Sequence, residues 1–111
     1  MIRALIQYED FAFQDILDHF AFYEEQQGLA LAERWQLTTY ATLRQLALMP
    51  QSGGPCFFSS PFLADVRKIS VTGFPHLIFY RFDSKNNMVR VVRIIHGARD
   101  IEALLSERSA N

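Results

Sequence analysis

The chain has 111 residues, of which 50% are hydrophobic, 14% are aromatic and 21% are charged. This composition excludes a disordered chain and predicts one compact domain over residues 1–111. The longest apolar runs are shorter than the roughly 20 residues of a membrane-spanning helix, and we expect no secretory signal at the N-terminus. The single cysteine, Cys56, excludes an internal disulfide, so the expected location is the cytoplasm.

The charges are sorted along the chain, although the formal net charge is only −1. Residues 1–65 carry three basic and eight acidic side chains, whereas residues 66–99 carry seven basic side chains and one acidic side chain. We interpret residues 66–99 as a basic face on an acidic body. These cations either pair with the chain's own acids or bind an acidic partner, which is nucleic acid or an acidic protein segment.

The first half of the chain predicts a strand followed by a helical hairpin. Alternating apolar residues predict a strand over residues 2–8. Asp10 is the expected N-cap of a helix over residues 11–26, whose buried positions are Phe13, Ile16, Leu17 and Phe20. Gly28 separates it from a second helix that ends before Pro50 and buries Ala32, Trp35, Thr39, Leu43 and Leu46. The short break predicts that the two helices are antiparallel.

The second half predicts a loop over residues 50–55 and then strands over residues 66–71, 75–82 and 88–96. We expect the phenylalanines after the loop to pack it onto the core; they are Phe57, Phe58 and Phe62. Strict alternation along the last strand places Arg93 on one face with Val89, Val91 and Ile95, and Arg90 on the other with Val92, Ile94 and His96. Asp100 is the expected N-cap of a short helix that carries Ile101, Leu104 and Leu105.

This order of elements predicts an α+β fold. The helical hairpin packs on one face of a mainly antiparallel four-stranded sheet, and the other face is open to solvent or to a partner.

No metal or cofactor is expected. The three histidines, His19, His76 and His96, are scattered along the sequence, and no pair of ligands has the short spacing of a structural zinc site. The sequence also has no glycine-rich loop of the kind that binds phosphates or dinucleotides.

The last third of the chain carries a more specific pattern. Its parts are Val66-Arg67, the run Gly73-Phe74-Pro75 before a strand ending in Phe79-Tyr80-Arg81, and the run from Val91 to Gly97 followed by Arg99-Asp100. In these features the sequence resembles the ParE/RelE superfamily of bacterial toxins from toxin–antitoxin modules, often described as plasmid stabilisation proteins. The resemblance implies the fold predicted above.

The superfamily contains two activities. RelE-like members are ribosome-dependent mRNA endoribonucleases, and the matching catalytic positions here are Arg67, Arg81 and His96. The tyrosine that many of these nucleases place after the last strand has no counterpart, because Gly97-Ala-Arg-Asp100 occupies that segment. The isoelectric point near 6.3 also disfavours docking on ribosomal RNA.

ParE-like members resemble the chain more closely, because they share the sequence His-Gly-x-Arg-Asp after the last strand. This resemblance implies inhibition of DNA gyrase by binding, without catalytic residues, and a cognate antitoxin that forms a hetero-oligomer with the toxin. The expected binding surface for the target or the antitoxin consists of Arg81, Arg90, Arg93, His96 and Arg99. A third hypothesis is a non-toxic interaction module with the same fold.

Overall fold

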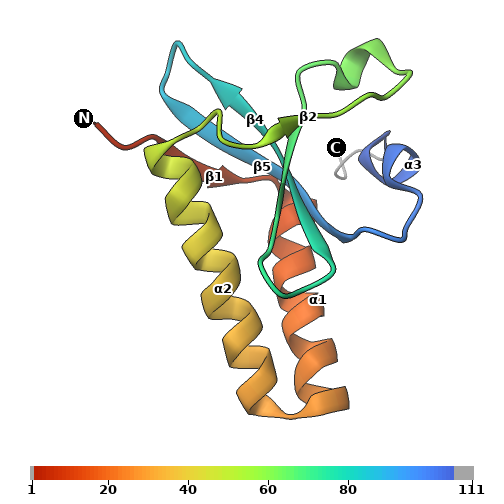
Figure 1. The fold of residues 1–111 in the computed structure, drawn as a ribbon. Helices are drawn as coiled ribbons and strands as arrows, with labels where there is room; N and C mark the ends of the chain where they lie inside the picture. Colours follow the sequence, from red (N-terminus) through yellow and green to blue (C-terminus); the bar gives the residue numbers. More distant parts are fainter. Residues whose placement is uncertain (1, 107–111) are drawn as a thin grey trace.

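The computed structural model describes residues 2–106 and has the predicted α+β architecture (Figure 1). Two long helices follow the first strand, and a β-rich second half ends in a short helix. The elements are β1 (Leu5–Tyr8), α1 (Asp10–Gln27), α2 (Leu29–Leu48), β2 (Gly54–Pro55), the 3-10 turn η1 (Pro61–Leu63), β3 (Arg67–Ser70), β4 (His76–Asp83), β5 (Met88–His96) and α3 (Ile101–Ser106). No helix within residues 2–106 has the length and hydropathy needed to cross a membrane.

The sheet has five strands in the order β1-β5-β4-β3-β2. Strand β1 is parallel to β5, whereas the other neighbours are antiparallel. The predicted count of four strands is wrong because Gly54 and Pro55, expected in a loop, pair with Lys68 and Arg67 as a short edge strand. Two residues are too few to produce an alternating pattern in the sequence.

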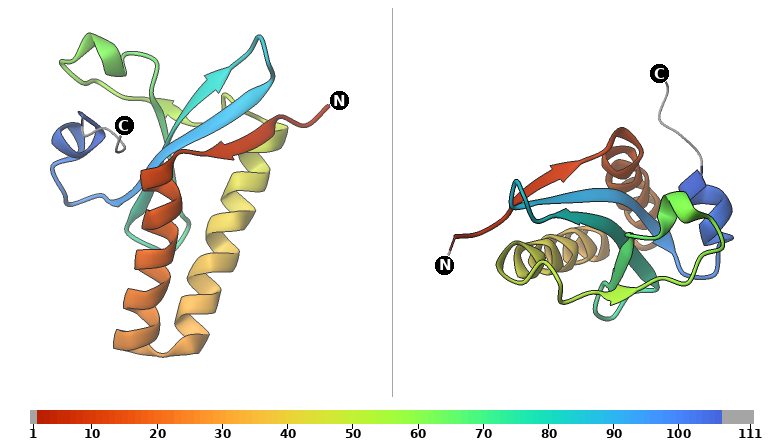
Figure 2. Two further views of the ribbon diagram at one scale, coloured as in Figure 1. Left: turned by 180° about the vertical axis from the view of Figure 1, so that it is seen from behind. Right: turned by 90° about the horizontal axis from the view of Figure 1, so that it is seen from above.

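The helical hairpin covers one face of the sheet, as predicted (Figure 2). Trp35 and Leu46 of α2 pack there with Ile78 and Tyr80 of β4, and all four residues are fully buried. The predicted apolar stripe of α2 is confirmed, because each of its members is buried; they are Ala32, Trp35, Thr39, Leu43 and Leu46.

The buried face of α1 differs from the prediction. Ile16 is buried, but Phe13 and Leu17 are 56% and 49% exposed, and Ala12 and Asp15 take the inward positions. The predicted face counted apolar residues alone and therefore left out the charged Asp15, which is buried.

Asp10 is not the N-cap of α1 but its first residue. The N-cap is Glu9, whose side chain makes no capping bond. The Glu9 amide instead donates a 2.9 Å hydrogen bond to the Val91 carbonyl. The extended chain beside β5 ends at Glu9, so the helix begins at Asp10, one residue earlier than an Asp10 cap requires.

The face opposite the hairpin is partly covered, which corrects the prediction of an open face. The η1 loop and α3 lie side by side over it in both views (Figures 1 and 2). They bury a second core of Leu63, Val66, Phe79, Val92, Ile95 and Leu105. Asp100 precedes α3 and caps it as predicted, because its Oδ1 accepts a 3.3 Å hydrogen bond from the Ala103 amide.

The predicted packing role of the phenylalanines holds only for Phe58, which contacts this second core. Phe57 and Phe62 are 92% and 77% exposed. Leu63, which the prediction passed over, is the buried anchor of the segment.

A β-bulge between β4 and β5 overturns the predicted alternation along β5. Phe79 pairs with Arg93, but the next residue of β4, Tyr80, pairs with Val91, so Val92 is an extra residue. Val91 and Ile94 therefore both belong to the helix-side core, and Val92 and Ile95 both belong to the second core. The predicted grouping is wrong beyond Val91 because strict alternation does not allow for an inserted residue.

Candidate binding surface

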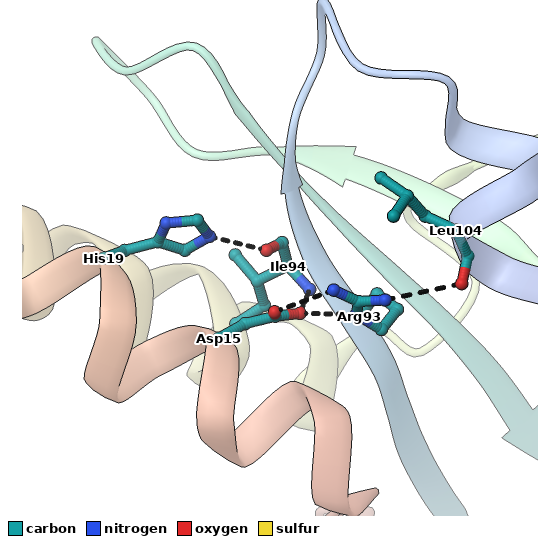
Figure 3. Close-up of polar contacts among 5 residues, drawn as sticks. All are labelled: Asp15, His19, Arg93, Ile94 and Leu104. Carbon is teal, nitrogen blue, oxygen red and sulfur yellow. Dashed lines mark hydrogen bonds and ion pairs between the residues drawn. The ribbon is translucent and has the colours of Figure 1, made fainter. Parts of the chain in front are cut away.

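Arg93 joins three elements of the fold (Figure 3). Its Nε and Nη2 donate to the two carboxylate oxygens of Asp15 in α1, at 2.8 and 3.0 Å. Its Nη1 donates to the Leu104 carbonyl in α3 at 3.3 Å, and the guanidinium lies 5.2 Å from the centre of the Phe11 ring. The Arg93 side chain is only 14% exposed. Arg93 therefore ties α1, β5 and α3 together.

The Asp15 carboxylate is fully used in this arrangement. Besides the two bonds from Arg93, it accepts a 2.9 Å hydrogen bond from the Ile94 amide. This amide belongs to the residue after Arg93 in the bulged part of β5, so Asp15 holds both the backbone and the guanidinium there. On the next turn of α1, His19 Nε2 donates to the Ile94 carbonyl at 2.7 Å.

Arg81 and Arg90 are directly opposite each other on β4 and β5, so their side chains leave the same face of the sheet. Arg81 donates to Asp65 Oδ1 at 2.7 Å and to the Phe62 carbonyl at 2.9 Å, and its side chain is 33% exposed. Arg90 is exposed and lies opposite Gln7 of the neighbouring strand β1. With Gln7, Tyr8 and Glu9, Arg90 lines a shallow depression at this side of the sheet.

His96 and Arg99 lie at the other end of β5, in the turn before α3. Both are exposed. His96 Nδ1 accepts a 3.1 Å hydrogen bond from the Ala98 amide, and the Arg99 amide donates to the His96 carbonyl at 3.1 Å. Arg90 and His96 are six positions apart on one strand, roughly 20 Å at the usual rise. The expected binding residues thus form two groups at opposite ends of β5, with Arg93 between them.

Arg67, one of the positions matched to the nucleases, has a local structural role. Its Nε and Nη2 donate to the Gly53 carbonyl at 3.2 and 2.8 Å, and Nη2 also donates to the Gln51 carbonyl at 3.2 Å. On the neighbouring strand β4, the hydroxyl of the buried Tyr80 accepts a hydrogen bond from the Gly53 amide at 3.0 Å and donates one to the Pro50 carbonyl at 2.8 Å. Together they fix the turn between α2 and β2.

The three positions matched to the nucleases do not converge. Arg67 pairs with Tyr80, so its side chain and that of Arg81, the next residue of β4, leave opposite faces of the sheet. His96 pairs with His76, five residues from Arg81 along β4, which is roughly 16 Å. A phosphate bound at one of these residues is out of reach of the others.

The packing of α1 on the sheet brings together the three histidines, which are scattered only in the sequence. The ring of His76 lies 4.4 Å from that of His19 in α1 and 5.8 Å from that of His96 in β5, measured between ring centres. His76 Nδ1 accepts a 3.3 Å hydrogen bond from Trp35 Nε1, which requires this nitrogen to be unprotonated. Burial, followed by the charges of the other two histidines, lowers the pKa of His76 to about 4.

This histidine group was missed because its members come from three separate elements. No spacing rule connects residues of α1, β4 and β5, and His76 lies opposite His96 only because of the β-bulge, which the sequence pattern did not predict. In the described part of the chain, no set of three or more His, Cys, Asp or Glu side chains is arranged to hold a metal ion.

The family model described as the ParE toxin of the type II toxin–antitoxin system parDE matches residues 6–101. The search of curated proteins finds no match to the sequence.

Two solved structures share the fold. A chain of the chromosomal ParDE system of P. aeruginosa is 15% identical, with a TM-score of 0.69 over 85% of this chain and 96% of that one. A chain of the RelBE toxin–antitoxin complex of Mycobacterium tuberculosis is 14% identical, with a TM-score of 0.57 over 86% of this chain and 99% of that one. At these identities the likeness establishes the fold alone.

Proposed function

The chain belongs to the ParE toxin family of type II toxin–antitoxin systems, and from this premise we propose that it inhibits DNA gyrase by binding and is neutralised by a cognate antitoxin. The inhibited gyrase remains on cleaved DNA and replication stops. This action needs a binding surface and no catalytic residue. Because gyrase acts on chromosomal DNA, the protein works in the bacterial cytoplasm.

The observation that carries this proposal over the nuclease alternative is the separation of Arg67, Arg81 and His96. Phosphate cleavage needs cations and a proton-transfer group at one scissile bond. Here two arginines leave opposite faces of the sheet, and the histidine is roughly 16 Å along the strand from the second of them. Both arginines also hold local structure, through the Gly53 carbonyl and the Asp65 carboxylate.

In this proposal the exposed side chains of Arg90, His96 and Arg99 contact the partner directly. Arg81 is one-third exposed and contributes next to Arg90. Arg93 acts by holding α1, β5 and α3 in position between the two groups. Separate groups at the two ends of β5 suit a large protein target or an antitoxin that extends across the sheet, since protein interfaces cover about 800 Å² per partner.

An antitoxin partner is supported by the two structural neighbours, which come from a ParDE system and from a RelBE toxin–antitoxin complex. The acceptor surface on this chain is rich in cations within residues 66–99. An antitoxin segment that folds as it binds covers a large surface and is still easily removed, because its binding must offset the entropy cost of ordering it. The two proteins then form a hetero-oligomer.

Two assays with the purified chain test the proposed target. We expect it to block supercoiling by purified gyrase and to increase the amount of cleaved DNA, with no ribosome-dependent cleavage of mRNA. In cells that express the chain alone, pulse labelling then shows DNA synthesis falling before protein synthesis. Early collapse of protein synthesis with mRNA cleavage supports the nuclease instead. If a folded, accumulated chain affects neither process, the protein is a non-toxic interaction module.

A further inference from the structure

Two phenylalanines stand out from the surface on the segment between β2 and β3. Phe57 is 92% exposed and Phe62 is 77% exposed, the largest values among the aromatic residues described. Neither side chain belongs to the two cores, whereas Phe58 and Leu63 of the same segment do. The two exposed rings therefore contribute little to folding.

The segment that carries these rings is firmly held. Glu102 of α3 accepts hydrogen bonds from the Ser59 amide at 3.1 Å, the Ser59 hydroxyl at 2.7 Å and the Ser60 amide at 3.2 Å. Arg81 donates to the Phe62 carbonyl at 2.9 Å from the other side. The Ser60 hydroxyl accepts from the Phe62 amide at 3.3 Å and so caps the η1 turn. A loop fixed in this way presents its rings without the entropy cost of ordering a flexible segment.

Positive charge surrounds the segment. Lys68 is exposed and lies opposite Gly54, where the segment begins. Burial raises the pKa of the Cys56 thiol, and the positive charge of the nearby Lys68 partly offsets this rise. Arg81 lies at the other end, with Arg90 opposite it on β5. Two acids lie at the same segment: Asp65 pairs with Arg81, and Glu102 accepts hydrogen bonds from Ser59 and Ser60 but keeps its negative charge. Against these two acids stand Lys68, Arg81 and Arg90, so the balance is one positive charge.

We propose that Phe57 and Phe62, flanked by Lys68 and Arg81, form a docking surface for a segment of the antitoxin that carries both acidic and apolar side chains. The inference rests on the proposed function for the existence of that partner. Aromatic side chains are enriched in the energetic centres of interfaces, and cations at the rim select acidic partners. A nucleic-acid ligand fits less well, because the chain has a net charge of −1.

The test measures binding of the full chain to its proposed cognate antitoxin. The double variant Phe57→Ala/Phe62→Ala is expected to weaken binding at least tenfold, since aromatic anchors cost the most when truncated. Lys68→Glu is expected to weaken binding several-fold, more at low salt than at high salt. Phe22→Ala is the matched control, because Phe22 is 57% exposed near the far end of the helical hairpin. This variant is expected to bind as the wild type does.

Unchanged antitoxin binding by the double variant overturns the inference and leaves the proposed function intact. A double variant that binds antitoxin normally but no longer inhibits gyrase also overturns it, because the rings then face the target. The inference is also overturned if the double variant loses only the binding of a single-stranded oligonucleotide. If the wild-type chain does not bind the antitoxin at all, the proposed function itself fails. Thermal unfolding of each variant checks the fold, and Lys68→Glu tests the surface without changing either ring.

Discussion

Arg93 of β5 and Asp15 of α1 are 78 positions apart in the sequence and form an ion pair through both carboxylate oxygens, at 2.8 and 3.0 Å. The pair is nearly buried, with 14% and 11% of the two side chains exposed. It also fixes the bulge of β5, because the same carboxylate accepts from the Ile94 amide. The most centrally placed cation of the basic half is therefore part of the framework that sets the positions of the others.

Asp15→Ala is expected to lower the free energy of unfolding by about 3 kcal/mol or more, because the change leaves a nearly buried guanidinium and the Ile94 amide without the carboxylate. Chemical denaturation measures the loss. Asp18→Ala is the matched control, since Asp18 is an exposed carboxylate one turn further along the same helix, bonded to Gln14. It should change stability by less than about 0.5 kcal/mol. Equal effects of the two substitutions would contradict a structural role for the pair.

The sequence predicts most of the fold because its strongest signals are periodic. The stripe of α2 from Ala32 to Leu46 and the apolar strands β4 and β5 each repeat over several turns or residue pairs, so single exceptions do not hide them. The details that were wrong are single-residue effects. Val92 is one inserted residue, and Asp15 is one charge in a buried position whose partner lies in a distant strand.

The candidate surface was less predictable than the fold. The sequence identified the cations of residues 66–99 but not which of them form contacts within the fold. Arg67 donates to carbonyls of a neighbouring turn, and Arg93 pairs with Asp15 of α1. The exposure of Phe57 and Phe62 was also hidden, because an apolar residue in a loop gives the same signal whether it packs inward or projects. Contacts between distant segments decide both questions.

The stability of the protein should fall as the pH drops from 7.5 to 5. His76 has a pKa of about 4 in the folded chain and an ordinary value of 6.5 when unfolded. Between these values the unfolded chain binds more protons, so the free energy of unfolding is largest above pH 6.5 and decreases as the pH falls towards 4. Protonation also conflicts with the hydrogen bond from Trp35 to His76 Nδ1. The expected loss between pH 7.5 and pH 5 is about 2 kcal/mol.

Denaturation of the wild type and His76→Phe across this range measures the effect, with Trp35, the only tryptophan, as a local fluorescence reporter. The variant keeps a flat ring and should show a much weaker pH dependence. His96→Gln, at the exposed end of the same histidine group, should retain most of it. Hydrogen bonds from Asn86 and Ser59 lower the pKa values of Asp83 and Glu102. Protonation of these two carboxylates destabilises the fold at lower pH, so the measurement stays above pH 5. Parallel curves for the wild type and His76→Phe would refute the assignment.

Arg90→Ala should weaken inhibition of gyrase without loss of stability. Arg90 is exposed, and among the described residues it makes no ion pair, so its removal costs the fold little. A binding anchor at a protein interface contributes about 1–3 kcal/mol, which corresponds to a 5- to 150-fold higher inhibitory concentration in a supercoiling assay. Arg34→Ala removes another exposed arginine, from α2, and should have no effect. If the two variants inhibit equally well, Arg90 is not part of the target surface.

Gly53→Ala should destabilise the protein far more than Gly54→Ala, although the two glycines are adjacent. A Cβ atom at Gly53 would lie 2.7 Å from the Lys68 carbonyl and would overlap the Tyr80 hydroxyl, whereas one at Gly54 meets nothing within 4 Å. The Tyr80 side chain is fully buried and bonded to Gly53 and Pro50, so it has no room to move. We expect a loss of about 2–3 kcal/mol for Gly53→Ala, equivalent to roughly 10 °C in the melting temperature. Similar melting temperatures for the two variants would show that the turn does not rest on Tyr80, and the positions of Arg67 and β2 beside it would then need another cause.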